Sequence, residues 1–338
     1  MITNPTPQRA LRGHQPQRPT PTTAATSAYL ARLTPRLTGR DRWLAHMLLE
    51  HRVLTTHQIT ELAWPSERAA NMRLLRLYRW RVIDRFQPFM TYGSAPMHYV
   101  LDIAGAALLA REHGIEPREL DYQHDRALGI AYSLHLAHTV GTNGFFTALI
   151  ARSRHPDTTG RLTAWWSEAR CTRLFGDIVR PDAYGIWQSG PTSVEWFLEF
   201  DFGTERPDRV AAKLPRYARL AATTGITTPV LIWMPTPRRE AQIRHALAEA
   251  LAGLDDPALV PIATINADAC SGDPAENRWH PLDNARPALR RLPLAELPRA
   301  WPHLPPVNPV RSADPHTGAG LPPPPPVPPS PTPRRPLR

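Results

Sequence analysis

The chain has 338 residues, enough for about two domains, and carries 40 Lys and Arg against 30 Asp and Glu, a formal net charge of +10. This basic balance favours a polyanionic partner, most simply double-stranded DNA. No apolar run approaches the roughly 18 residues of a membrane span, and no apolar segment at the N-terminus is typical of a secretory signal, so the sequence predicts a cytoplasmic protein without a membrane partner.

Residues 1–35 are predicted to form a disordered basic arm. The first 40 residues contain no Asp or Glu, and the segment is rich in Pro and Thr without a candidate core. Its charge comes from Arg9, Arg12, Arg18, Arg32, Arg36 and Arg40. Such an arm is expected to contact phosphate groups nonspecifically.

Residues 36–118 are predicted to form a winged helix-turn-helix domain. Apolar residues at helical spacing follow Thr38, and Thr55 with Gln58 has the spacing of a capping box at the start of a second helix. Pro65 ends that helix and Ser66 can cap a third one over 67–80. Strand-like segments at 82–86 and 98–101 then flank a turn, and three helices followed by a hairpin are typical of this motif.

The third helix is the predicted recognition helix. Leu74, Leu75 and Leu77 can face the core, which leaves a set of arginines for phosphates or base edges. The candidate DNA-binding residues are Arg68, Arg73, Arg76, Arg79 and Arg81. The alternatives are a solvated helix face that is rich in Arg, or a domain used for homodimerisation.

Residues 119–285 are predicted to form an α/β domain of restriction-endonuclease type. A helical stretch at 124–153 comes first, and helices at 206–223 and 237–253 follow among the strands. Strand-like segments lie at 162–166, 178–187, 194–202, 229–234 and 260–265. Residues 286–338 hold 18 of the 40 prolines and are predicted to be a disordered tail, with the alternative that they bind an aromatic groove of a partner.

Acidic residues and the sole lysine of the chain follow one another across the second domain. Asp182 follows Pro181 at the mouth of a strand, Glu199 and Asp201 end the next strand, and Lys213 lies on the following helix. Because strand side chains alternate, Glu199 and Asp201 are expected to face the Asp182 side together. Glu168 adds a fourth carboxylate. Carboxylates that converge on Mg²⁺ or Mn²⁺ beside a basic group are suited to phosphodiester cleavage.

This order resembles the PD-(D/E)XK nuclease superfamily. With the winged helix in front and Trp166-x-Glu168 upstream, residues 36–270 look like the replication-relaxation family of actinobacterial and plasmid proteins. The resemblance implies Asp182 and Glu199 as metal ligands, Glu168 as an accessory acid and Lys213 as the phosphate or water partner. One departure is that the superfamily pattern has Lys where this chain has Asp201.

Two DNA-directed functions remain open at the level of sequence, beside a third possibility, an interaction scaffold whose proline-rich tail recruits a partner. One is a Mg²⁺-dependent or Mn²⁺-dependent DNA-nicking endonuclease of plasmid replication, with Asp182, Glu199 and Asp201 as the metal set. The other is a non-catalytic DNA-binding regulator or replication accessory with a degenerate nuclease fold. Replication or conjugation proteins are the expected protein partners. A Walker A loop and the His triplet of conventional relaxases are both absent from the sequence.

Overall fold

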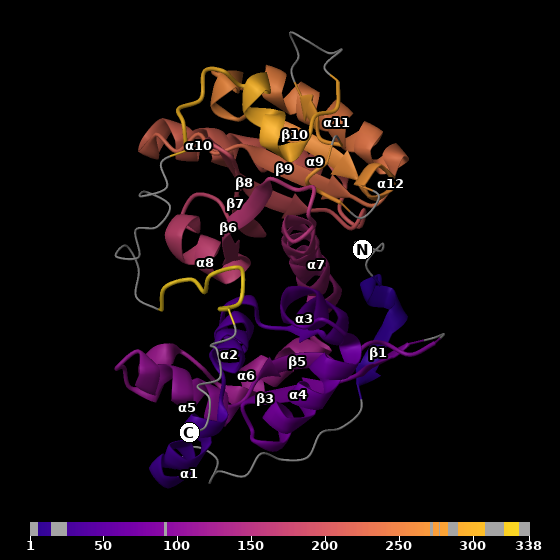
Figure 1. The fold of residues 1–338 in the computed structure, drawn as a ribbon. Coiled ribbons are helices and arrows are strands. Elements are labelled where there is room, and N and C mark those ends of the chain that lie inside the picture. The colour runs from indigo at the N-terminus through magenta and orange to yellow at the C-terminus, as the bar shows by residue number, and fades with distance from the viewer. Residues whose placement is uncertain are drawn as a thin grey trace. The chain divides into compact units, whose positions relative to one another are not determined.

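A computed structural model of the chain describes residues 6–14, 26–90, 93–270, 273–276, 278–282, 290–307 and 321–330. The chain divides into two compact units. We call Thr6–Asn143 together with residues 321–330 the N-terminal unit, and the described part of Gly144–Gly318 the C-terminal unit (Figure 1). Helices and strands are mixed throughout, which confirms the predicted mixture of α and β structure at that level.

The N-terminal unit contains helices and two small sheets. One sheet has the strand order β2-β5-β3 and is antiparallel, and the other pairs β1 with β4. In chain order the elements are β1 (Leu11–His14), α1 (Ser27–Leu33), α2 (Gly39–His51), β2 (Leu54–Thr55), α3 (Thr56–Ala63), α4 (Glu67–Arg79), β3 (Ile83–Phe86), β4 (Pro88–Met90), β5 (His98–Leu101), α5 (Ile103–Glu112) and α6 (His124–Leu128).

Polar caps define where these helices begin. Thr38 and Asp41 form a reciprocal capping box at α2, and Thr55 and Gln58 form the predicted one at α3. Ser66 accepts a hydrogen bond from the backbone of Ala69 at the start of α4. These side chains bond backbone N–H groups that the first helical turn leaves without a partner, so α2, α3 and α4 begin at defined residues.

The C-terminal unit is built on a six-stranded mixed sheet in the order β11-β10-β9-β8-β7-β6. Strands β6, β7 and β8 are antiparallel, β8, β9 and β10 are parallel, and β11 returns antiparallel to β10. The strands are β6 (Gly160–Ser167), β7 (Ala183–Ser189), β8 (Thr192–Phe200), β9 (Val230–Met234), β10 (Ile262–Asn266) and β11 (His280–Leu282). The helices include α7 (Leu136–Ser153, which crosses the division between the units), α8 (Glu168–Phe175), α9 (Pro207–Ala211), α10 (Leu214–Thr224), α11 (Pro237–Ala252) and α12 (Ala267–Cys270).

Both faces of the sheet are covered. Figure 1 shows α10 and α11 beside β8, β9 and β10, and apolar residues of these helices share one core with Phe197 and Ile232. On the other face, Phe146 of α7 stacks on Trp165 and Trp196. Because β9 is buried along its whole length, its sequence is a continuous apolar run rather than an alternating pattern.

Several predicted boundaries differ from the observed ones. The helix predicted at 206–223 is split into α9 and α10, because Pro215 lacks a backbone N–H and fits only the first turn of a new helix. The helix predicted at 124–153 is split as well, since Ser133 is extended between α6 and α7. The strand predicted at 178–187 begins only at Ala183, after a turn that follows α8.

The predicted arm and tail are only partly described. Within residues 1–35, α1 is capped by Thr26 and buries Leu30 and Leu33. Beyond residue 286, the 3-10 helix Leu294–Ala300 buries Leu294 and Leu297, and residues 321–330 pack on the N-terminal unit. These stretches are ordered because they carry apolar residues that the folded units cover. Residues 1–5, 15–25, 283–289, 308–320 and 331–338 lie outside the described ranges. Among the described residues, no helix has the length and apolar run that crossing a bilayer requires.

Candidate functional site

Two acidic residues lie close together at one edge of the large sheet, and a third lies at the same edge. Ser167, the last residue of β6, pairs with Ala183, the first residue of β7, and Ala183 pairs with Leu198 on β8, so Glu168, Asp182 and Glu199 each lie one residue beyond a paired position. Asp182 is fixed by two bonds to β8: its backbone N–H donates to Leu198 O (3.0 Å), and its Oδ2 accepts from the Phe200 N–H (2.7 Å). The charge of Asp182 contributes to raising the pKa of Glu199 and of Lys213, so its carboxylate lies within electrostatic reach of both side chains.

Glu199 is the buried residue at the centre of this acidic group. It is 3% exposed, and its two carboxylate oxygens have different partners. Lys213 Nζ donates to Oε2, and the hydroxyl of buried Tyr217 donates to Oε1 at 2.5 Å. Lys213 is the N-cap residue of α10 and Tyr217 lies one turn further on, so the start of α10 determines both contacts.

The electrostatics of the cluster favour an added positive charge. Burial, reinforced by the charge of Asp182 and opposed by Lys213, raises the pKa of Glu199 to about 7. Burial alone would lower the pKa of Lys213, but attraction to Glu199 and Asp182 outweighs it, so that pKa is raised. Two carboxylates and one ammonium leave a net charge of −1, which a proton or a divalent cation can offset.

The donor set of the cluster fits a hard divalent cation. Mg²⁺ is usually held through one or two carboxylates, with water or substrate phosphate at its other positions. Asp182, just before β7, and Glu199, on the neighbouring β8, supply two carboxylates, and the raised pKa of Glu199 reflects first its burial and then the charge of Asp182. Lys213, with 34% of its side chain exposed, remains accessible to a bound anion.

Asp201 has a different role from the one expected. Its carboxylate accepts from Arg239 Nε (2.6 Å) and from a terminal nitrogen of the same guanidinium (3.1 Å), and also from the Gly203 N–H (3.0 Å). Asp201 lies one residue beyond the end of β8 at Phe200, and both of its carboxylate oxygens are bonded to Arg239 rather than directed to Glu199. The structure therefore does not bring Asp201 into a three-carboxylate group with Asp182 and Glu199. Glu168 is exposed at the first residue of α8, at the same edge as Asp182.

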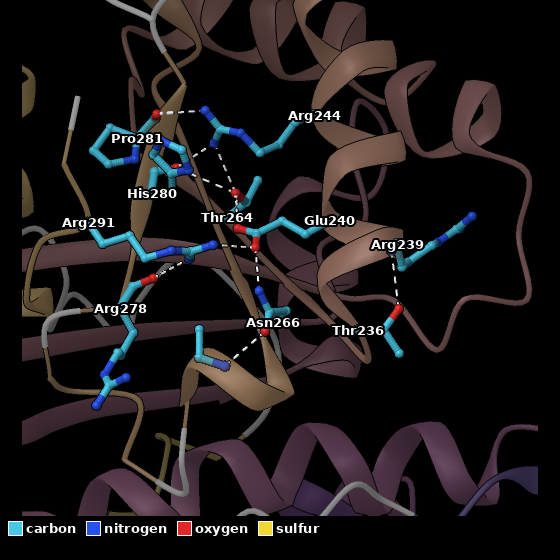
Figure 2. Close-up of polar contacts among 11 residues, drawn as sticks. Thr236, Arg239, Glu240, Arg244, Thr264, Asn266, Arg278, His280, Pro281 and Arg291 are labelled. Atoms are coloured by element: carbon cyan, nitrogen blue, oxygen red, sulfur yellow. Dashed lines mark hydrogen bonds and ion pairs between the residues drawn. The ribbon is translucent and has the colours of Figure 1, made fainter. Parts of the chain in front are cut away.

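Consecutive residues of α11 fix different parts of the unit. Arg239 binds Asp201, whereas buried Glu240 accepts from Thr264 (2.7 Å), Asn266 (2.5 Å) and Arg291 (2.5 Å). Figure 2 shows the two side chains leaving the helix in opposite directions. The Glu240 contacts attach α11 to β10 and to the segment after β11, which is a structural role. Arg239 instead fixes the end of β8 two residues from Glu199.

The predicted DNA-binding arginines fall into two groups. Arg68, Arg76 and Arg79 are exposed on α4, on the same stripe as Met72, which is 56% exposed. Arg73 is half-buried: its Nε donates to Asp41 on α2 at 2.8 Å, and its guanidinium lies over the ring of Trp80. Arg81 follows α4 and lies 3.8 Å from the Asp102 carboxylate. The first group is therefore available to a ligand, and the second holds the unit together.

A second polar cluster in the N-terminal unit was not predicted from the sequence. Among the described residues it is the one group of three potential metal ligands whose ligand atoms all lie within 4.8 Å: Asp84, Asp102 and His124. Both carboxylates are fully buried, and His124 lies 3.4 Å from Asp84 and 3.3 Å from Asp102. A hydrogen bond with Asp84 raises the pKa of His124 despite its burial. Protonated His124 and Arg81 together balance the two carboxylates, which is the arrangement of an ion-pair cluster.

Sequence reasoning missed the roles of Tyr217 and Arg239 in the C-terminal unit. Tyr217 is buried among the apolar residues of the core, yet its hydroxyl is bonded to Glu199. Its position four residues after Lys213, on the same helix face, is a signal that could have found it. Arg239 has no such signal, because it reaches Asp201 across 38 residues of sequence.

Comparison with known proteins gives a family match. Residues 46–232 match the model of the replication-relaxation family, which is 187 of the 338 residues and more than half of the chain. No curated protein and no solved structure matches the chain. The matched range includes α4 and the Asp182, Glu199 and Lys213 cluster, and it ends before Arg239.

Proposed function

The chain belongs to the replication-relaxation family, which supports a replication-related role, and we propose that it binds double-stranded DNA and nicks it in a metal-dependent reaction. The observation that carries this proposal is the convergence of Asp182, Glu199 and Lys213 at one edge of the sheet. Two carboxylates beside a lysine are what a phosphodiester-cleaving site of the PD-(D/E)XK type requires.

The N-terminal unit is proposed to be the DNA-binding module. Helices α2, α3 and α4 followed by β3, β4 and β5 have the order of a winged helix, in which α4 would be the recognition helix. Arg68, Arg76 and Arg79 expose their charges on α4, which suits contacts to phosphates and base edges. Arg76→Ala should lower the slope of log affinity against log salt by about 0.9, the contribution of one phosphate contact. Arg73→Ala is the matched comparison, because its guanidinium is bonded to Asp41.

The C-terminal unit is proposed to be the nuclease-like domain. Its antiparallel β6-β7-β8 meander continues into parallel β9 and β10, with α10 and α11 against one face of the sheet. The lysine of the superfamily pattern would here come from the start of α10 rather than from position 201. Lys213 Nζ donates a hydrogen bond to Glu199, so a lysine at the start of α10 would supply the ammonium group that position 201 supplies in the superfamily pattern.

Each residue of the cluster has a distinct chemical task in this proposal. Asp182 and Glu199 would hold Mg²⁺ or Mn²⁺, which when bound supplies Lewis-acid activation of water and of the scissile phosphate. Lys213 would stabilise the charge that develops on the phosphoryl oxygens. Tyr217 fixes the rotamer of Glu199 through its hydrogen bond, and Glu168 is an accessory acid at the rim.

A plasmid-nicking assay tests this function. Supercoiled plasmid is incubated with the purified protein with and without Mg²⁺ or Mn²⁺, beside Asp182→Ala and the control Asp177→Ala, an exposed aspartate five residues upstream. Metal-dependent open circles are expected for the wild type and the control. They are expected to be lost in Asp182→Ala, which should still bind DNA. Nicking that persists in Asp182→Ala would refute the site.

A second function is favoured by the pairing inside the site. Lys213 and Tyr217 satisfy Glu199 within the fold, and Arg239 satisfies Asp201 at the position where the superfamily has lysine. Such a site can be purely structural in a non-catalytic DNA-binding protein of replication. In that case the protein shifts DNA in a gel without a metal requirement, and no plasmid is nicked under any of the metal conditions.

A further inference from the structure

The proline-rich segment 321–330 lies against α2 of the N-terminal unit. Trp43 on α2 is 5% exposed, and its indole Nε1 donates a 2.7 Å hydrogen bond to the main-chain carbonyl of Pro325. Further along the segment, Pro329 Cγ is 3.4 Å from the position that a Cβ on Gly39 would occupy. Between these two contacts the segment therefore runs from Trp43 toward the first turn of α2.

The sequence and the burial of the segment fit a bound polyproline II ligand. Consecutive prolines have a fixed φ and restrict the preceding residue to extended geometry, which favours a left-handed polyproline II helix with three residues per turn over residues 322–326. Burial follows that period. Pro324 and Pro326 are buried, Leu321 and Pro323, each three residues earlier, are half-buried, and Pro322 and Pro325 on the third edge are exposed. Over residues 321–326, two edges thus face the protein and one faces solvent; the pattern ends at a bend at Pro326 and Val327, and Val327 is 40% exposed.

The polar contact fits the same mode of recognition. A polyproline II helix has no internal hydrogen bonds, so its carbonyl groups remain available as acceptors. A buried indole N–H needs an acceptor, and here the Pro325 carbonyl provides one. A segment that met the unit only through nonspecific apolar contact would not require a tryptophan donor at this position. Domains that bind proline-rich peptides use the same combination of an aromatic surface and a rigid, pre-extended ligand.

We propose that the Trp43 side of α2 is a peptide-recognition site for polyproline II segments, and that residues 321–330 of the same chain are its resident ligand. The site is independent of the sheet edge at Asp182 and of the proposed nicking activity. Its ligand class is a run of prolines that presents two edges to α2 and one carbonyl to the indole. Because the resident segment is attached to the protein, a free peptide of the same sequence has to compete with it.

Competition with a free peptide tests the proposal in the full-length protein. A fluorescein-labelled peptide with the sequence of residues 320–330 is titrated by anisotropy against the wild type and two double variants. Pro324→Ala/Pro326→Ala removes the two buried rings. Pro322→Ala/Pro325→Ala removes the same number of prolines from the exposed edge and keeps the carbonyl at position 325.

The peptide should bind Pro324→Ala/Pro326→Ala about tenfold or more tightly than the other two proteins, because apparent affinity scales with the fraction of sites that are open. Adding Trp43→Phe to that variant should weaken binding by about 2- to 12-fold, the range that one neutral hydrogen bond contributes. Circular dichroism checks that the variants are folded. Failure of the peptide to bind Pro324→Ala/Pro326→Ala, or equal binding to all three proteins, would overturn the proposal.

Discussion

Replacing Glu199 with glutamine is expected to remove a pH-dependent loss of stability from the C-terminal unit. Burial, with the help of Asp182 and against the effect of Lys213, raises the pKa of Glu199 from 4.5 to about 7. A carboxyl whose pKa is higher in the folded state contributes stability that is present below pH 4.5 and is lost as the pH rises through 7. A difference of about 2.5 in pKa corresponds to about 3 kcal/mol.

Urea unfolding between pH 4.5 and pH 8 measures this effect. Tryptophan fluorescence reports mainly on the C-terminal unit, which holds seven of the ten tryptophans, among them the fully buried Trp165, Trp196 and Trp233. The free energy of unfolding of Glu199→Gln, relative to that of the wild type, should rise by about 3 kcal/mol from pH 4.5 to pH 8. The comparison reports on Glu199 and on its ion pair with Lys213, because burial lowers the pKa of Lys213 and attraction to Glu199 raises it.

A relative stability that is the same at pH 4.5 and pH 8 would refute the reasoning that burial and like charge destabilise ionised Glu199. Lys213→Met provides a second check, because it should increase the pH-dependent loss of stability that Glu199→Gln removes. Without the ammonium, the pKa of Glu199 should rise further, so the loss of stability should extend to a higher pH than in the wild type. If the proposed function holds, Glu199→Gln becomes more stable relative to the wild type as the pH rises from 4.5 to 8 and loses nicking, as expected where a site keeps a costly charge for its chemistry.

Three further predictions concern structural contacts. The hydrogen bond with Asp84 raises the pKa of His124 above 6.5, so the stability that it contributes is present below pH 6.5 and lost as the pH rises through the raised value; His124→Asn should flatten this dependence in denaturant titrations. Arg239→Met should destabilise the C-terminal unit by about 3–5 kcal/mol in thermal melts, because Asp201 is left buried without its partner. Gly105→Ala should destabilise the N-terminal unit by about 1–3 kcal/mol or more, since the added Cβ would lie 2.2 Å from a main-chain oxygen.

Control substitutions test whether the losses of stability in Arg239→Met and Gly105→Ala come from the contacts named above. Arg238→Met removes an exposed guanidinium beside Arg239 and should leave the melting temperature nearly unchanged. Gly129→Ala adds a Cβ that meets no atom within 4 Å, so its effect should be small. Equal destabilisation by Arg238→Met and Arg239→Met would show that the Asp201 ion pair is not the cause.

The sequence predicts the core of the candidate site because its geometry is local. Asp182 immediately precedes β7 and Glu199 lies on β8, the two strands of one hairpin, so their chain order already places them close together. Lys213 follows within the next connection, and helix α10 begins where Pro215 requires it to begin. The same locality explains why the capping box of Thr55 was predictable, since its donors and acceptors lie three residues apart.

Contacts made by distant elements could not be predicted in the same way. The expected role of Asp201 depended on strand alternation, but the strand ends one residue earlier and Arg239 arrives from a helix that docks independently. Likewise, the composition of residues 322–326 predicts their backbone conformation and says nothing about what they bind. Trp43 lies 282 residues away from Pro325, and only the folded chain brings the indole to that carbonyl.

The sequence order of the N-terminal unit has a consequence for synthesis. Residues 6–143 leave the ribosome first, and the segment that covers Trp43 follows only after the whole C-terminal unit has been made. At about 5–20 residues per second, the 282 residues between Trp43 and Pro325 take roughly 15 to 60 s to translate. A nascent chain therefore presents an uncovered tryptophan surface for that interval, when chaperones or a neighbouring chain on the same polysome can reach it.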